Sequence, residues 1–370
     1  MIIPPAPQPP EFSPTVKAIF DYYAEKYNAE LSRPYLGGSI IGTACERALW
    51  YGFHWATKKQ FSGQLLRLFQ RGHKEEPWLV EDMRAIGITV WDTNPDTGKQ
   101  WSFSEPATGH HLAGNADGIL QGIPEAPKTP HLWECKTHST KSFNDVKSKG
   151  VLLSKPLHYA QMQIYMHWTQ ATFGKANGCK RALYTAVCKE TDEIYSERIY
   201  FDKAFALELI DKAKRVITAK TPPPRISDDA TWFECKFCDH HAVCHTETVP
   251  LVSCRTCTHA SAEMDGNARW ACNLDKETPS TIPVEVQRKG CDCHRFNPFL
   301  LNHWALPVDA SVNHNWVKYT NKTTGQSFIN GIPPEGHTSA EIFAAPDKKA
   351  LSDPDVQAYR HGEFKARIVG

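Results

Sequence analysis

The placement of the cysteines constrains this chain more than any other feature of its sequence. Eight of the twelve cysteines lie between Cys235 and Cys293. Scattered cysteines are usually small buried hydrophobes, whereas clustered cysteines form disulfides or bind metal ions. The first residues lack the basic and apolar segments of a secretory signal, so we expect a reducing compartment, where metal sites are commoner than disulfides. The cysteine-rich stretch therefore predicts metal-binding structure.

The rest of the composition is that of an ordinary globular protein. The 370 residues are 41% hydrophobic and 22% charged, which excludes a wholly disordered chain. Lysine and arginine number 42 against 41 aspartates and glutamates, so the net charge of +1 excludes a histone-like polycation. A local basic cleft for nucleic acid is compatible with this balance. No run of about 18 apolar residues occurs, so we expect neither a membrane-spanning helix nor a membrane partner.

Helical and strand patterns alternate through the first 220 residues. Helical spacing of apolar residues occurs at 15–31, 64–86, 156–170 and 203–220. Strand-like patterns occur at 88–91, 101–103, 110–120, 131–137, 182–187 and 194–201. Turn residues predict hairpins that pair 88–91 with 101–103, 182–187 with 194–201 and, in the tail, 316–319 with 327–329. These patterns predict an α/β fold with a mixed sheet flanked by helices.

Two of the predicted strands carry the strongest chemical signal, Asp117-Gly118 in one and Glu134-Cys135-Lys136 in the other. Alternate strand residues share a face, so Glu134 and Lys136 project together, while Cys135 can offer its backbone carbonyl. Carboxylate and carbonyl oxygens are the ligands that Mg²⁺ and Mn²⁺ prefer. If the two strands are neighbours, these residues predict a metal-dependent site for phosphodiester hydrolysis, with Lys136 orienting water or stabilising negative charge. Because Glu-x-Lys is common, a surface ion pair is the alternative.

These motifs resemble the PD-(D/E)XK nuclease superfamily. Downstream, Gln161-x-x-x-Tyr165 is similar to a motif of the RecB-like branch, and the two side chains share one helix face. Upstream, Gly72-x-x-x-Glu76-Pro77 is similar to the lambda-type exonuclease pattern, whereas His73 matches the RecB-like histidine position. Either Glu76 or His73 is therefore a candidate to complete the site. The resemblance implies that Gln161 and Tyr165 support the substrate or the catalytic strand.

The resemblance covers residues 35–245 and implies a restriction-endonuclease-like core. We expect a flexible proline-rich arm at 1–14, a RecB-like nuclease domain at 15–248, a zinc-binding module at 249–305 and a hairpin with a tail at 306–370. The nuclease domain would be closed by its own cysteine cluster, and the C-terminal cysteine-rich module would follow it.

Three cysteines, Cys235, Cys238 and Cys244, follow the predicted nuclease strands and helices with x2 and x5 spacing. A tetrahedral metal site or a cubane cluster needs a fourth ligand, which local spacing does not identify. The iron–sulfur branch of RecB-like nucleases, including CRISPR-associated exonucleases, pairs such a trio with an upstream cysteine. Cys45 matches that position, so the resemblance implies a [4Fe–4S] cluster. The alternatives are zinc, bound by the trio with His240, His241 or His245, and a buried Cys45 without metal.

A second cysteine set follows directly. Cys254-x-x-Cys257 supplies one ligand pair, and Cys272 with a residue of Cys291-Asp292-Cys293-His294 supplies the other. Two such pairs are typical of a zinc knuckle or ribbon. Cys291 is the expected fourth zinc ligand because it follows Gly290 at a turn, with Cys293 and His294 as alternatives. A cysteine-rich loop without metal is the remaining alternative.

The resemblance implies a DNA nuclease dependent on Mg²⁺ or Mn²⁺, more typically an exonuclease, in recombination, repair or viral DNA processing. The expected partner is single-stranded DNA or the end of a duplex, in a bacterial or phage-infected cytoplasm. The chain has no P-loop, so a helicase motor would have to be a separate partner protein. The alternatives are a catalytically silent DNA-binding or scaffold protein on the same fold, and the nuclease subunit of a helicase–nuclease complex.

Overall fold

A five-stranded mixed sheet organises the N-terminal half of the computed structural model, which describes residues 13–332, 336–345 and 351. Its strands, in spatial order, are β2 (Thr89–Trp91), β5 (Gly118–Gln121), β6 (His131–His138), β7 (Arg181–Cys188) and β8 (Ile194–Tyr200). Only β6 and β7 are parallel, and the other pairs are antiparallel. The predicted α/β fold with a mixed sheet is confirmed, as is the hairpin of β7 and β8.

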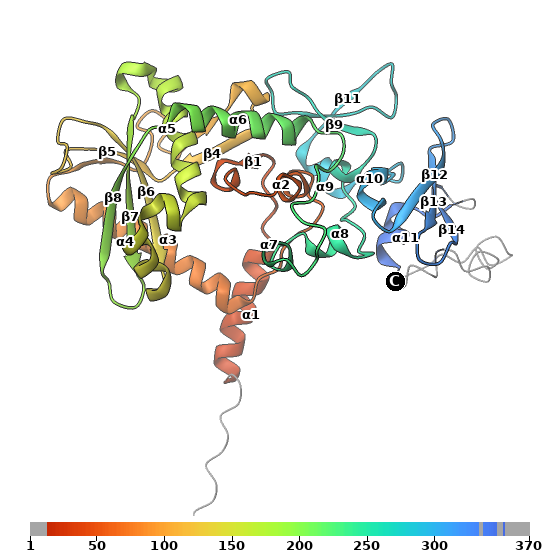
Figure 1. Cartoon of the computed structure of the whole chain (residues 1–370), viewed down its shortest axis with the longest axis horizontal. Coiled ribbons are helices and arrows are strands. Elements are labelled where there is room, and N and C mark those ends of the chain that lie inside the picture. The colour runs from red at the N-terminus through yellow and green to blue at the C-terminus, as the bar shows by residue number, and fades with distance from the viewer. Residues whose placement is uncertain (1–12, 333–335, 346–350, 352–370) are drawn as a thin grey trace, which may run out of the picture.

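Helices cover both faces of this sheet (Figure 1). They are α3 (Gly63–Ala85), α4 (Thr140–Ser154), α5 (Pro156–Asn177) and α6 (Lys203–Thr218). On one face, Leu79 and Met83 of α3 pack with Trp133 and Cys135 of β6. On the other, apolar residues of α5 and α6 pack with Leu132 of β6 in the largest cluster. Buried side chains therefore alternate between the two faces along β6, as its strand period requires.

A second small sheet corrects one predicted pairing. β3 (Trp101–Ser104) pairs with β4 (Leu112–Ala116), which also pairs with β1 (Leu36–Gly37), while β2 pairs with β5 in the main sheet. The expected hairpin of 88–91 with 101–103 is therefore wrong. The turn does form, since Gly98 N donates to Asn94 O at 2.8 Å. Turn residues show where a chain reverses, but burial decides which partner each strand takes.

The expected single strand at 110–120 is also divided. β4 ends at Ala116 and β5 begins at Gly118, so Asp117 is the one residue between two strands of different sheets. At this break the Asp117 side chain contacts β6, where Cys135 N donates to its carboxylate.

The cysteine-rich stretch forms short elements in the middle of the molecule (Figure 1). They are α7 (Phe233–Lys236), α8 (His241–His245), the 3-10 helix η3 (Cys254–Thr256) and α9 (Val284–Lys289), and α2 (Glu46–Phe53) of the N-terminal half carries Cys45 at its start. Three three-residue strands form a sheet in the order β11 (Ser280–Ile282), β10 (Trp270–Cys272), β9 (Ala260–Ala262). These elements are too short to enclose a core by themselves.

The C-terminal unit is a three-stranded antiparallel sheet with two short helices. Its elements are α10 (Pro298–Leu301), β12 (Ala305–Ser311), β13 (Trp316–Asn321), β14 (Ser327–Asn330) and α11 (Ser339–Ala344). The predicted tail hairpin is confirmed as β13 and β14. Its core joins Tyr319 and Phe328 to Trp304, Phe296 and Val249. The predicted domain limits stay a prediction, and the described cores cross two of them, because Val249 packs here and Trp270 packs in the N-terminal core.

The remaining elements are the 3-10 helices η1 (Gly38–Ile40) and η2 (Pro106–Thr108) and the helix α1 (Pro14–Asn28). α1 extends away from the main body and has no buried residue (Figure 1). Residues 1–12 of the predicted arm and 352–370 of the predicted tail lie outside the described residues. Within the part described, each helix falls short of the length or the apolarity that crossing a membrane requires.

Candidate functional site

Asp117 is fixed to the middle of β6 by a backbone hydrogen bond. Cys135 N donates to Asp117 Oδ2 at 2.8 Å, and Lys136 Nζ lies 3.8 Å from the same oxygen. The pairing of Gly118 with Trp133 sets this register. Residues eighteen positions apart in sequence are thus neighbours, as the two-strand hypothesis requires.

Glu134 is completely buried and held from two sides. Lys136 Nζ donates to Glu134 Oε1, and Gln161 Nε2 donates to Glu134 Oε2 at 2.8 Å. Lys136 Nζ also donates to the carbonyl of Cys135 at 3.0 Å. The Cys135 side chain points into the opposite core, so only its backbone faces the site. Four side chains therefore converge here: Glu134 and Lys136 from β6, Gln161 from α5, and Asp117 from the position just before β5.

The electrostatics of this group show an excess of carboxylate charge. Burial raises the pKa of Glu134 to about 8, and the neighbouring Asp117 and Glu76 add to the effect against Lys136. Burial and Asp117 likewise raise the pKa of Glu76 to about 7. Burial opposes the charged form of Lys136, but Glu134 and Asp117 outweigh it and raise its pKa. One ammonium does not balance three clustered carboxylates, so the group favours additional positive charge.

α3 supplies both candidates for the third acidic position. Glu76 and His73 line the same cleft as Asp117 and Lys136. The helix passes close to β6, because a Cβ on Gly72 would lie only 3.3 Å from Thr137 Oγ1. Glu76 interacts electrostatically with Asp117, Lys136 and Glu134. Glu76 therefore lies near the carboxylates, and His73 lines the same cleft.

Tyr165 takes a different position from Gln161 on α5. Its ring packs against the second sheet, where a Cβ on Gly114 would lie 2.2 Å from Tyr165 Oη and one on Gly38 would lie 2.7 Å from Tyr165 Cε1. Tyr165 also stacks on Trp168, with ring centroids 5.2 Å apart. Gln161 thus holds a carboxylate, whereas Tyr165 holds β4, the strand that leads into Asp117.

The site opens into a cleft of about 840 Å³. Besides the predicted residues, its walls include the side chains Arg33, Tyr35, Phe69, Asn115 and Lys189. Arg33 carries no motif and lies far from the others in sequence, so no sequence signal marked it.

A buried polar chain adjoins the site on the Lys136 side. His138 Nε2 and His158 Nδ1 both hydrogen-bond to Tyr184 Oη, at 2.8 and 3.0 Å. Sequence reasoning missed these residues. The available signal was that His138 lies two residues beyond Lys136 on the same strand face.

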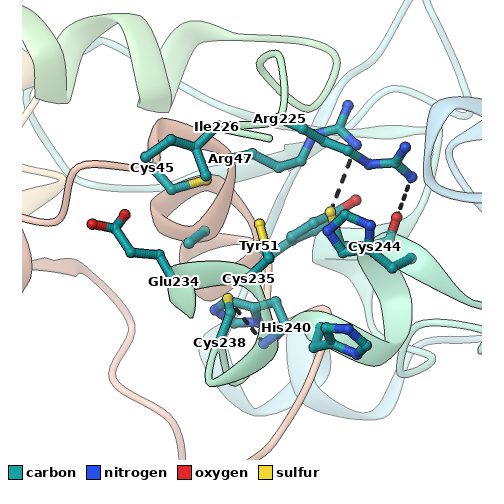
Figure 2. A pocket seen from close by; sticks show the side chains of 13 residues that line it. Cys45, Arg47, Tyr51, Arg225, Ile226, Glu234, Cys235, Cys238, His240 and Cys244 are labelled. Carbon is teal, nitrogen blue, oxygen red and sulfur yellow. Dashed lines mark hydrogen bonds between the residues drawn. The ribbon is translucent and has the colours of Figure 1, made fainter. Parts of the chain in front are cut away.

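The first cysteine set gathers in one pocket (Figure 2). Cys45 at the start of α2 lines it together with Cys235, Cys238 and Cys244, although Cys45 is nearly two hundred residues distant in sequence. Arg47 Nη1 approaches Cys244 Sγ at 4.0 Å, and His240 N donates to Cys238 Sγ at 3.4 Å. Such donors stabilise thiolate charge. The donor set therefore fits a thiolate-bound group.

The histidines of that pocket are partly committed elsewhere. His240 Nδ1 bonds to Thr57 Oγ1 at 2.7 Å, and His241 Nε2 bonds to Ala230 O at 3.2 Å. One ring nitrogen of each is thereby used, while His245 also lines the pocket, so these bonds leave the mixed cysteine–histidine set open.

The second cysteine set lines a separate small pocket. Its lining includes Cys254, Cys257, Cys272, Cys291 and Cys293, together with His294. The described cysteines are all free thiols. Across the residues that the structure describes, no three His, Cys, Asp or Glu side chains stand in geometry ready to hold a metal ion. The thiols of each set share a pocket, and metal binding would require them to close further.

Comparisons with known proteins add only distant likenesses. No protein-family model and no curated protein sequence matches the chain. The crystal structure of SSO0001 is similar at TM-score 0.35 and 15% identity, covering 63% of this chain and 96% of that one. The alkaline exonuclease LHK-Exo from Laribacter hongkongensis is similar at TM-score 0.35 and 15% identity, covering 54% of this chain and 90% of that one. Its complex with dAMP is similar at TM-score 0.34. At these scores the likenesses establish neither fold nor activity.

Proposed function

We propose that this chain is a metal-dependent DNA nuclease with a PD-(D/E)XK-like core that hydrolyses phosphodiester bonds. The observation that carries the proposal is the convergence of Asp117, Glu134 and Lys136 in an open cleft, with Gln161 holding Glu134. The excess carboxylate charge supports occupation by a divalent cation. Asp117, Glu134 and the Cys135 carbonyl would hold Mg²⁺ or Mn²⁺, whose role when bound is to polarise the phosphate and acidify water.

The protein groups have separable roles in this proposal. Lys136 lies beside both carboxylates, where its ammonium can hold the attacking water and stabilise negative charge on the phosphate. Glu76 faces the same point from α3 and supplies a third carboxylate, in preference to His73. Gln161 keeps Glu134 in one orientation, and Tyr165 keeps β4 in place behind Asp117.

We also propose a [4Fe–4S] cluster on Cys45, Cys235, Cys238 and Cys244. Four thiols around one pocket, with Arg47 beside them, support a thiolate-bound cluster. Its contribution would be structural, since it would link α2 to the segment around α8. Anaerobically purified protein should be brown, with broad visible absorption and four iron atoms per chain as the cluster formula requires. Colourless protein with stoichiometric zinc at these residues would reject the cluster.

Digestion of end-labelled linear DNA and closed circular DNA with Mg²⁺ or Mn²⁺ tests the activity. We expect the wild-type chain to degrade linear DNA from its ends and to leave closed circles intact. Cutting of closed circles would reject a strict exonuclease. Inactivity on single-stranded, double-stranded, linear and circular DNA would instead favour a silent DNA-binding protein.

Variants of the site show whether the cleavage comes from this chain or from a contaminating nuclease. Asp117→Asn, Glu134→Gln and Lys136→Met should each reduce cleavage by about 100-fold or more, because the first two remove a carboxylate that would hold the cation and the third removes the ammonium beside water and phosphate. Glu193→Gln is the matched control, since Glu193 is an exposed carboxylate whose partner is Lys147. Equal cleavage by the site variants and the control would contradict the assignment.

A further inference from the structure

Cleft residue Arg33 is positioned by the cysteine-rich stretch. The segment 32–34 has no helix or strand of its own, yet three consecutive carbonyls each accept a hydrogen bond. Arg288 Nη2 donates to Ser32 O at 2.7 Å, and Arg255 Nη2 donates to Pro34 O at 2.8 Å. Trp55 Nε1 donates to Arg33 O at 2.9 Å. Both arginines belong to the cysteine-rich stretch, which therefore sets the course of this segment.

The three donors are packed into one assembly. The Arg255 guanidinium lies 3.8 Å from the Trp55 ring centroid and 4.6 Å from that of Trp270, and Arg288 lies 4.6 Å from Trp55. Trp55 has φ of 51°, a left-handed conformation that is unusual for a bulky residue. Surrounding contacts must impose this conformation. The stacked arginines and the left-handed backbone of Trp55 thus hold segment 32–34 in one conformation.

Arg33 itself is free to meet a ligand. Its side chain is exposed and lines the cleft with Asp117 and Lys136. Gln161 and Tyr165 of α5 line the same cleft. None of the ion pairs formed between described residues involves Arg33. An unpaired guanidinium beside a phosphodiester site is suited to bidentate phosphate contact.

The stretch that holds Arg33 has little apolar material to stabilise it. Trp270 packs in the N-terminal core and Phe296 in the C-terminal core, and none of the clusters of described residues is centred between them. Small units of this kind usually need a metal or disulfides. Its described thiols are free, and five of them line one pocket: Cys254, Cys257, Cys272, Cys291 and Cys293.

Short elements bring these thiols to one pocket. Cys254 begins η3, Cys257 follows its end, Cys272 ends β10 and Cys291 follows Gly290, and all four line the same pocket. His259 N approaches Cys257 Sγ at 3.5 Å, and Cys291 receives a backbone hydrogen bond from Cys293. Amide donors two residues after a cysteine stabilise thiolate charge in such turns. Tetrahedral binding by four thiolates is characteristic of structural zinc.

We propose that Cys254, Cys257, Cys272 and Cys291 bind one zinc ion, and that the zinc-bound segment positions Arg33 to bind a DNA phosphate in the cleft. The connection is short: Arg255 directly follows Cys254, and Arg288 lies on α9, where Val286 O is 3.8 Å from Cys254 Sγ. That the ligand of Arg33 is a DNA phosphate rests on the proposed nuclease function. The zinc site does not depend on that function.

Metal content of the full chain tests the first half. Zinc measured by mass spectrometry should fall by one equivalent in Cys272→Ser, and cobalt substitution of the wild type should give thiolate-to-metal absorption that this variant lacks. Cys179→Ser is the matched control, because Cys179 is a buried thiol of the N-terminal core. Cys291→Ser should lose the ion and Cys293→Ser should retain it. Equal zinc in wild type and Cys272→Ser would overturn the site.

Binding of a short fluorescein-labelled single-stranded DNA tests the second half, in an Asp117→Asn background that prevents cleavage. Arg33→Gln should weaken binding by about 5- to 30-fold and reduce the salt dependence by about one phosphate contact. Arg181→Gln should bind like the parent, because its guanidinium lies over Tyr200 outside the cleft lining. Equal affinity of Arg33→Gln and the parent would overturn the phosphate contact.

A double variant shows whether loss of the zinc ion acts through the position of Arg33 or through damage to the whole fold. Cys272→Ser should weaken binding about as much as Arg33→Gln, and combining them should add little, since both act through one contact. Arg288→Gln, which leaves every thiol intact, should retain zinc and still weaken binding. If the two losses of DNA affinity multiply in the double variant, the zinc site and Arg33 act independently and the proposed coupling is overturned. If the Asp117→Asn parent binds no DNA, both the phosphate contact of Arg33 and the proposed nuclease function are rejected. The zinc measurement still decides whether the metal site exists.

Discussion

At the residue scale, Glu134 shows how a buried charge is kept in one orientation. Its two oxygens are held by different elements, Oε1 by Lys136 on its own strand and Oε2 by Gln161 on α5. Residues that hold ligating groups in this way typically affect metal affinity or activity by about 10- to 100-fold. Gln161 is therefore the most informative position next to the carboxylates.

Gln161→Leu should reduce cleavage by about 10- to 100-fold and raise the Mn²⁺ concentration needed for half-maximal rate, because Glu134 loses its second hydrogen bond. Initial rates against Mn²⁺ concentration measure both effects. Gln170→Leu is the control on the same helix, since Gln170 bonds only to backbone carbonyls of Met166 and Cys179. A matching metal requirement in the two variants would exclude a role for Gln161 at the site.

Arg255 is a buried cation with neutral partners. It is 2% exposed and donates to Gln287 Oε1 at 2.9 Å, Phe53 O at 2.9 Å and Pro34 O at 2.8 Å. Only a guanidinium can reach three diverging acceptors while stacking on tryptophan rings.

Arg255→Lys should lower the free energy of unfolding by about 3 kcal/mol, because it leaves buried acceptors unpaired. Urea denaturation measures the change. Arg215→Lys is the control: this arginine pairs with Glu46 at the surface, so a loss of at most about 1 kcal/mol is expected. Similar stabilities for the two variants would argue against the multiple-acceptor role.

At the element scale, the site depends on close approach between α5 and β4. Gly114 leaves no room for a side chain, since Tyr165 Oη would lie 2.2 Å from its Cβ. β4 leads directly into Asp117, so displacement of this strand moves a catalytic carboxylate.

Gly114→Ala should destabilise the protein by about 1–3 kcal/mol through overpacking and should reduce cleavage more than stability alone explains. Adding Tyr165→Phe removes the nearest clashing atom and should restore part of both losses. Thermal unfolding and initial rates, measured on Gly114→Ala, Tyr165→Phe and the double variant, check this rescue. Strictly additive losses would show that Tyr165 and Gly114 do not meet as described.

The strand that carries the motif was predictable because its pattern is local. Alternation along 131–138 placed Glu134 and Lys136 on one face, and the structure has the same arrangement. Pairing was less predictable. The strands at 89–91 and 101–104 flank a real turn, yet join different sheets, because each is buried against a different partner. Local sequence specifies alternation, whereas burial specifies pairing.

At the scale of the whole molecule, histidines with lowered pKa are buried or half-buried in several parts of the fold. Burial lowers the pKa of six histidines to about 3 or 4, and these are His54, His138, His158, His240, His294 and His303. His54 stacks on Trp50 with ring centroids 3.7 Å apart and has Nδ1 2.9 Å from Trp50 O.

Acid should therefore destabilise the fold. Burial lowers the pKa of His54 from 6.5 to about 3, so the unfolded chain binds more protons between these values and stability falls as pH drops below 6.5. At pH 5 this histidine alone contributes a loss of about 2 kcal/mol. Urea denaturation from pH 7.5 to 5 should show a smaller loss in His54→Gln. An unchanged pH dependence would contradict a buried neutral His54.

The sequence by itself determined the α/β class, the alternation that exposes Glu134 and Lys136 together, and the existence of two cysteine sets. All of these depend on spacing within a single segment. Only the tertiary structure decided that Glu76 and His73 line the cleft of the carboxylates, that Cys45 shares a pocket with a distant trio, and that Arg33 lies in the cleft. These contacts join segments far apart in the chain, where packing and burial, and not local periodicity, choose the neighbours.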